Sequence, residues 1–90
     1  MIRRPVAAGR FYPAGARELA TDVDALLERA EHRDVPGLRG LVAPHAGYVY
    51  SGPIAASAFK TLAARKGEIR RVVLLGPSHY LGFDGLALAP

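Results

Sequence analysis

Two histidines follow prolines at the ends of short apolar runs in this chain of 90 residues. His45 comes directly after Pro44, and His79 comes two residues after Pro77. Imidazole is the commonest metal-ligating side chain and a frequent acid–base catalyst. His45 and His79 are therefore candidates for a metal site or for acid–base chemistry. A histidine after an apolar run is also often an ordinary loop residue, so the spacing alone leaves both interpretations open.

Other residues near the two histidines have open roles. Tyr48 either lines a pocket or packs the loop in which it lies. Ser78 is adjacent to His79, but neighbouring residues rarely point at each other, so a serine–histidine catalytic pair is not indicated. Asp84 is the nearest acid after His79. The chain has no cysteine, which excludes a disulfide framework, a thiolate metal site and a cysteine nucleophile within these 90 residues.

Two helices are predicted from the spacing of apolar residues. The first begins at Ala16, is closed by Pro36 and Gly37, and buries a stripe with a period of 3.6 residues. This stripe is Leu19, Val23, Leu26, Leu27 and Ala30. The second helix is expected to carry Pro53 in its first turn, where the missing N–H costs nothing. Its predicted buried stripe is Ile54, Ala58, Phe59 and Leu62.

Two short apolar runs are predicted to be strands: residues 38–43, buried on both faces, and residues 70–75, whose β-branched and apolar residues make the clearest strand pattern. A strand, a helix and a second strand in this order make a βαβ unit of a mostly parallel sheet with flanking helices, so the predicted fold class is α/β. The carboxyl ends of parallel strands lie at one edge of the sheet, where ligands bind in such folds. The pattern therefore predicts that His45 and His79 lie close together.

Composition limits the class of protein. A mass of 9.6 kDa with 50% hydrophobic and 22% charged residues is typical of one small globular domain. No apolar stretch is long enough to span a bilayer and no signal peptide is evident, so we expect a cytoplasmic protein without a membrane partner. The net charge is +4, but the arginines are scattered and no nucleic-acid motif accompanies them. We therefore expect no nucleic-acid partner.

Three segments resemble the Memo family, which is also called AmmeMemoRadiSam system protein B. They are Arg-Pro-Val-Ala-Ala-Gly-Arg-Phe-Tyr-Pro at 4–13, Ala-Pro-His-Ala-Gly-Tyr-Val-Tyr-Ser-Gly at 43–52, and Leu-Gly-Pro-Ser-His at 75–79. The order and separation of these motifs make the resemblance specific. It covers nearly the whole chain but only the N-terminal portion of a family member. Residues 1–90 are therefore expected to be a single partial Memo-like domain, truncated at its C-terminus.

The resemblance implies a fold related to that of the class III extradiol dioxygenases, which are non-haem iron enzymes. It also implies a divalent metal, iron(II) or copper, with His45 and His79 as two of its ligands. The family's third ligand comes from far downstream. Tyr80 stands where many members have a further histidine. Tyr48, Ser78 and Tyr80 are expected to line the pocket or to orient the metal ligands.

Two functions follow from the resemblance, and whether the chain is an enzyme is left open. One is a metal-binding protein with iron- or copper-dependent redox chemistry of the dioxygenase kind. The alternative is a non-catalytic binding or adaptor module of the AmmeMemoRadiSam system, with a radical-SAM protein and an Ammecr-like protein as partners. A small sheet would also leave a bare edge, so self-association through that edge is a further expectation.

Overall fold

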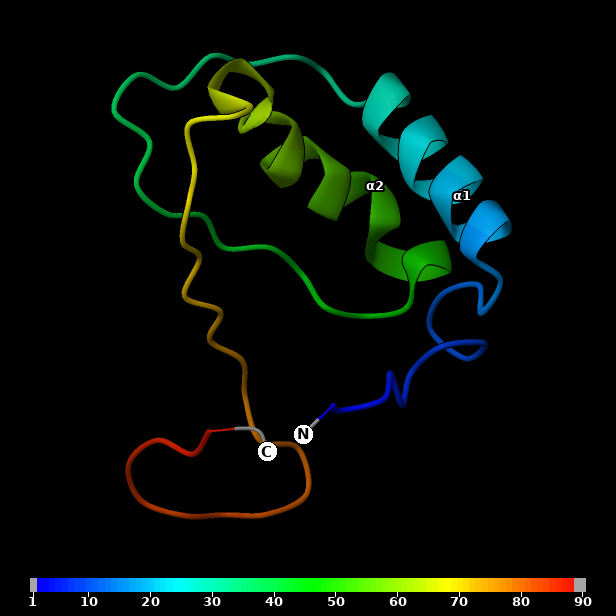
Figure 1. Cartoon of the computed structure of the whole chain (residues 1–90), viewed down its shortest axis with the longest axis vertical. Coiled ribbons are helices and arrows are strands. Elements are labelled where there is room, and N and C mark those ends of the chain that lie inside the picture. The colour runs from blue at the N-terminus through cyan, green and yellow to red at the C-terminus, as the bar shows by residue number, and fades with distance from the viewer. Residues whose placement is uncertain (1, 89–90) are drawn as a thin grey trace.

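The computed structural model describes residues 2–88 and is built from two helices joined by long irregular segments (Figure 1). Helix α1 is Ala16–Arg29, helix α2 is Tyr48–Lys60, and a short 3₁₀ helix, η1, is Ala63–Arg65. The remaining described residues form turns and extended segments. Among residues 2–88, no helix has both the length and the apolar character needed to cross a membrane.

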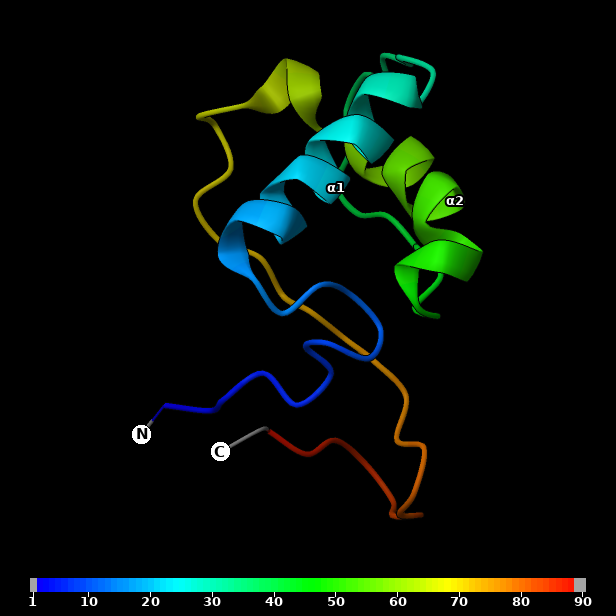
Figure 2. The same cartoon turned by 90° about the vertical axis from the view of Figure 1, so that its right-hand side faces the viewer.

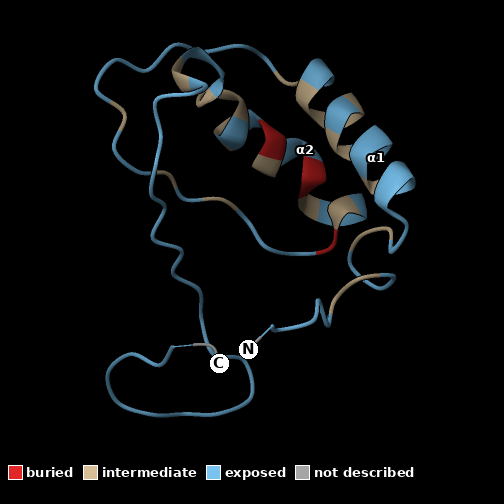
Figure 3. Ribbon diagram, in the orientation of Figure 1, coloured by how far each residue is buried: buried red, intermediate tan, exposed pale blue. Residues whose placement is uncertain are grey.

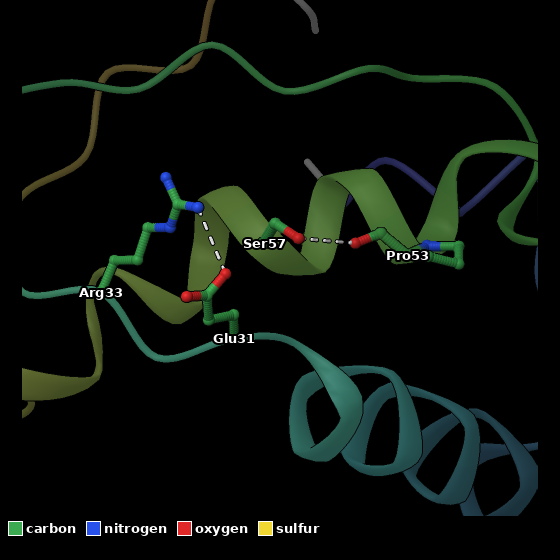
Figure 4. Close-up of polar contacts among 4 residues, drawn as sticks. All are labelled: Glu31, Arg33, Pro53 and Ser57. Atoms are coloured by element: carbon green, nitrogen blue, oxygen red, sulfur yellow. Dashed lines mark hydrogen bonds and ion pairs between the residues drawn. The ribbon is translucent and has the colours of Figure 1, made fainter.

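Helix α1 begins where the sequence predicts and ends earlier. Its half-buried side carries Leu19, Val23, Leu26 and Leu27, four of the five residues of the predicted stripe, which confirms the helical phase. The helix ends at Arg29, and Ala30 is already extended, with ψ of 140°. Beyond it, Glu31 and Arg33 form an exposed ion pair of 3.2 Å (Figure 4). An exposed ion pair contributes at most about 1 kcal/mol to stability. This is too little to extend α1 to the predicted end at Pro36.

Helix α2 begins five residues before the predicted start, so the prediction that Pro53 lies in its first turn was wrong. A tertiary bond starts the helix early: the Tyr48 N–H donates to the Phe11 carbonyl at 2.8 Å. First-turn N–H groups have no partner within a helix, so this acceptor stabilises the start. Pro53 cannot bond back to Val49, but Val49 is exposed and water can reach its carbonyl.

The hydroxyl of Ser57 reinforces the same stretch of α2. Its Oγ donates to the Pro53 carbonyl at 3.1 Å, one turn earlier (Figure 4). A serine in a helix commonly makes this bond to the carbonyl four residues before it. The backbone around Pro53 therefore stays helical in spite of the missing donor.

The face that α2 buries differs from the predicted one. Gly52 and Ala56 are the buried residues of the helix, one turn apart, and both belong to the side that lines α1 (Figure 3). Ile54, the first residue of the predicted stripe, is 66% exposed. The prediction assumed that the larger apolar residues of the helix would be the buried ones. Because α2 packs closely against α1, small residues occupy the buried positions instead.

The two helices pack against each other at an angle with their C-terminal ends at the same end of the pair, so residues 30–47 return the chain to the start of α2 (Figures 1 and 2). At their C-terminal ends, the Lys60 ammonium group donates to the Leu27 carbonyl at 2.6 Å. Leu27 lies in the last turn of α1, where carbonyls lack a partner within the helix. A cation from α2 therefore caps the negative end of α1.

The predicted βαβ unit was wrong. Within residues 2–88 the structure has no strand and no sheet, only an isolated bridge between Ala8 and Tyr12. Residues 38–43 and 70–75 are extended, but no backbone hydrogen bond joins them to each other. A parallel strand buried on both faces needs helices on both sides of the sheet. This chain has two principal helices, and they pack against each other.

Without a sheet, the second apolar run lies open to solvent, whereas Leu38, Leu41 and Ala43 of the first are half-buried. Residues 72–75 are all exposed, and the segment that holds them leads away from the helices (Figures 1 and 2). Ala56 is the single buried hydrophobic residue among those described. The fold is therefore a helix pair with extended arms, and these arms carry both histidines.

Candidate metal centre

His45 lies on a segment that is fastened at both ends. At the start, the Arg65 guanidinium donates to the Leu38 carbonyl. At the far end, the Tyr48 N–H donates to the Phe11 carbonyl. Pro44 ends the extended run, and the exposed imidazole of His45 follows three residues before α2. These two attachments limit how far His45 can move relative to the helix pair.

His79 lies at the end of the 69–78 segment, in a bend. The Ser78 hydroxyl donates to the Leu81 carbonyl at 2.6 Å, and this bond closes the turn around His79. The Ser78 oxygen is thus engaged with the backbone of its own turn. The imidazole of His79, like that of His45, is exposed to solvent.

The two imidazoles meet although 33 residues of chain separate them. Their ring centroids are 5.2 Å apart, and the ring planes are inclined by 43°. Two imidazoles on one ion, with nitrogen–metal distances of about 2.1 Å and a tetrahedral angle, have centroids about 5 Å apart. The separation in this chain therefore fits a shared ion. The loops bring the histidines together even though the predicted sheet edge does not exist.

The three other predicted residues lie at different distances from this pair. The Tyr80 ring stands edge-on to His79, with centroids 6.4 Å apart. Tyr48 lines the same cavity as His45, while Ser78 is held in its turn. Among residues 2–88, no third histidine, aspartate or glutamate joins the two histidines in a group that could hold a metal, so Asp84 does not complete a ligand set there.

A cavity of about 720 Å³ lies beside His45. Residues of α1 and α2 form about half of its wall, among them Leu26 and Ala56. Leu74 closes one side from the 69–78 segment. His45, Ser51 and the tyrosines supply its few polar groups, and such a mixture is typical of small-molecule pockets.

Two aromatic residues near this cavity were not singled out as site residues from the sequence. The Phe11 carbonyl anchors the start of α2, and the Tyr12 ring packs on Tyr48 with centroids 5.6 Å apart. A tight turn presents both, since the Gly9 N–H donates to the Tyr12 carbonyl at 2.7 Å. The available signal was a pair of aromatics between the breakers Gly9 and Pro13. Aromatics placed in an irregular segment need a packing partner elsewhere in the chain.

Comparison with known proteins decides the family. A family model described as Memo-like protein matches residues 3–89. The chain belongs to the Memo family. This confirms the resemblance carried by the three motifs, two of which contain His45 and His79.

Individual Memo relatives come from archaea, bacteria and animals. A MEMO1 family protein of Thermotoga neapolitana is 45% identical over 89 residues, which cover 88% of this chain and 32% of that protein. A MEMO1 family protein of Nitrosopumilus maritimus is 38% identical over 85 residues, covering 89% and 30%. Protein MEMO1 of Xenopus tropicalis is 37% identical over 89 residues, covering 99% and 29%. The chain thus spans about 30% of the length of these relatives. No solved structure matches it.

Proposed function

We propose that this Memo-family chain provides two imidazole ligands, His45 and His79, to a divalent metal site that takes iron(II) or copper. The observation that carries the proposal is the 5.2 Å separation of the two ring centroids. Imidazole suits both metals, and this separation of the two rings is compatible with their sharing one ion. The remaining coordination positions would be filled by water or by groups from outside these residues.

An iron(II) or copper ion held there would supply redox and Lewis-acid chemistry of the dioxygenase kind. The chain's own residues would supply position and surroundings. Attachment of the 38–48 segment by Arg65 and Phe11 fixes one ligand, and the Ser78 bond to Leu81 shapes the turn of the other. The cavity beside His45 offers an apolar surface on which the body of a bound molecule could lie.

Copper(II) and anaerobic iron(II) titrations of the 90-residue chain test the proposal. We expect one ion per chain by calorimetry and by metal analysis after dialysis. The variants His45→Ala and His79→Ala should each weaken binding by at least tenfold. His32→Ala is the matched control, because His32 is exposed on the connection after α1 and lies outside the pair; its metal affinity should equal that of the parent chain.

A second readout comes from the aromatic content of the chain, which has four tyrosines and no tryptophan. Copper(II) quenches tyrosine emission at short range, and the Tyr80 ring is 6.4 Å from His79. Quenching should therefore decrease in Tyr80→Phe without a loss of affinity. Equal binding by the parent chain and the His45→Ala/His79→Ala double variant would overturn the proposal.

A further inference from the structure

Ser51, in the first turn of α2, makes a hydrogen bond to the loop that carries His45. Its hydroxyl donates to the Ala46 carbonyl at 3.0 Å. Ala46 directly follows His45 in the chain, so the bond holds the residue next to the first candidate ligand. It lies nearer to His45 along the chain than the attachments at Leu38 and Tyr48 do.

The reach of this bond differs from that of other hydroxyl groups in the two helices. Thr21 and Ser57 each donate to the carbonyl four residues earlier, inside their own helix. Such a bond is common for serine and threonine in helices and concerns the helix alone. Ser51 instead donates five residues back, to a carbonyl that precedes the helix.

Helix α2 does not need this bond for its own start. At an N-terminus the groups without a partner are N–H donors, and a carbonyl before the N-cap is not among them. The N-cap residue is Gly47, and its carbonyl accepts from the N–H groups of Tyr50 and Ser51 at 2.9 and 3.1 Å. The Ser51 hydroxyl therefore fastens the loop to the helix and does not complete the helix.

The residue between the helix and Ala46 is also held in place. Gly47 is buried, and a Cβ atom placed on it would lie 3.4 Å from both Cδ1 and the carbonyl oxygen of Phe11. The chain at Gly47 thus runs directly against the N-terminal segment. Because Gly47 is packed and the Ala46 carbonyl is bonded, the backbone that follows His45 has little freedom to turn.

We propose that Ser51 is a positioning residue for His45, and that its hydroxyl holds the imidazole where it meets His79. The inference rests on the proposed metal site and adds to it a residue that does not touch the ion. His45 is exposed, so packing alone does not fix its ring, and the backbone that carries it must do so. Without the hydroxyl, the loop would populate conformations in which the two rings are apart. An ion that needs both rings would then bind more weakly, because the competent state is less populated.

Copper(II) titration of three serine variants tests the inference. Ser51→Ala should weaken binding about fivefold, since the loss of one neutral hydrogen bond changes an equilibrium by about that factor. Ser51→Thr keeps a hydroxyl, and the cavity beside Ser51 leaves room for the added methyl group, so its affinity should equal that of the parent chain. Ser57→Ala is the matched control, because it removes a hydroxyl that bonds within the same helix; its affinity should also be unchanged. Alanine favours a helix more than serine does, so circular dichroism should show no loss of helix in either alanine variant.

A second readout in the metal-free chain separates this inference from the proposed function. The chain has three histidines, so the ring protons of His45 and His79 can be assigned from single alanine variants. With ring centroids 5.2 Å apart, they should give a nuclear Overhauser cross-peak in the parent chain, in Ser51→Thr and in Ser57→Ala. In Ser51→Ala this cross-peak should lose most of its intensity.

A weaker cross-peak in Ser51→Ala that Ser51→Thr restores supports the positioning role, even where the parent chain binds no copper(II). That lack of binding would overturn the proposed function alone. A cross-peak and an affinity in Ser51→Ala equal to those of the parent chain would overturn the inference. So would equal losses in Ser51→Ala and Ser57→Ala, a failure of Ser51→Thr to restore the cross-peak, or a parent chain that lacks it.

Discussion

Gly52 is a buried residue of α2 that packs against Leu26 of α1. A Cβ atom placed on it would lie 3.0 Å from Leu26 Cδ1 and 3.3 Å from Leu26 Cδ2. Glycine normally costs a helix about 1 kcal/mol relative to alanine, so its presence in mid-helix calls for a packing reason. The close contact with Leu26 is that reason, because a side chain at position 52 would require the Leu26 side chain to shift.

Replacing this glycine tests the contact. Gly52→Val should lower the free energy of unfolding by about 2 kcal/mol, because an overpacked interface typically costs about 1–3 kcal/mol. Urea unfolding followed by circular dichroism would measure the change. Tyr50→Val is the control, since it places a β-branched side chain at a position of the same helix that is 85% exposed; we expect a loss below about 0.5 kcal/mol. Equal losses in both variants would show that helix propensity, not contact with Leu26, is responsible.

Individual residues of the candidate site could be identified from the sequence to different extents. His45 and His79 stand out because each follows a proline at the end of an apolar run, and the structure brings their rings to 5.2 Å. The bond from the Tyr48 N–H to the Phe11 carbonyl could not be predicted. It joins two backbone groups, so it does not depend on the type of either side chain.

At the scale of elements, the helix pair is joined by a cation from one helix at the C-terminal end of the other. The Lys60 ammonium group donates to the Leu27 carbonyl at 2.6 Å in a part-buried position. A hydrogen bond that involves a charged group contributes about 1.5–3 kcal/mol. The bond also places positive charge where the α1 dipole is negative.

Removing this ammonium group while retaining most of its apolar stem isolates the bond. Lys60→Met should lower the free energy of unfolding by about 1–2 kcal/mol, because the Leu27 carbonyl loses its donor in a part-buried position. Lys66→Met makes the same substitution at an exposed lysine beyond η1 and should change stability by less than about 0.5 kcal/mol. Urea unfolding of the parent chain, Lys60→Met and Lys66→Met would measure these differences in stability. Identical midpoints for the two variants would contradict a capping role for Lys60.

Helices and strands were predicted correctly where they depend on interactions between residues close in sequence, and wrongly where they depend on distant residues. Helix α1 could be predicted because its stripe and its first turn are local properties of the sequence. The start of α2 could not, since it depends on a carbonyl 37 residues earlier in the chain. The strand predictions failed for a related reason. Residues 38–43 and 70–75 have strand-like composition, but a ladder also needs a neighbour and a covering layer on each face.

On the scale of the whole molecule, the chain exposes more surface than a compact protein of its mass. Its accessible surface is 8418 Å², whereas a folded monomer of 9.6 kDa exposes about 5,100 Å². The radius of gyration is 14.8 Å, against about 12 Å for a compact domain of 90 residues. Folding buries only about 40% of the surface of the extended chain, where small domains bury about 60%.

This low burial should appear in the heat of unfolding. A compact domain of 90 residues absorbs about 60 kcal/mol near 60 °C. Scaled by the buried fraction, the monomeric chain should absorb about 40 kcal/mol or less. Scanning calorimetry of the chain, at concentrations where sedimentation shows a monomer, would measure it. An enthalpy near 60 kcal/mol with a two-state transition would show that the chain packs far more surface than the helix pair does.

The contact between His45 and His79 has a thermodynamic consequence besides chemistry. It joins the fastened 38–48 segment to the 69–78 segment, which no backbone hydrogen bond attaches to the rest of the described chain. An ion shared by the two rings would close a loop of about 35 residues. If it constrained the unfolded chain as firmly as a disulfide does, the loss of loop-closure entropy would be worth about 4 kcal/mol at 25 °C. For a chain with so little buried surface, that amount is comparable to the whole stability of a small core. The ion would then act as a structural tie that decides whether the C-terminal arm is held against the helix pair or moves independently of it.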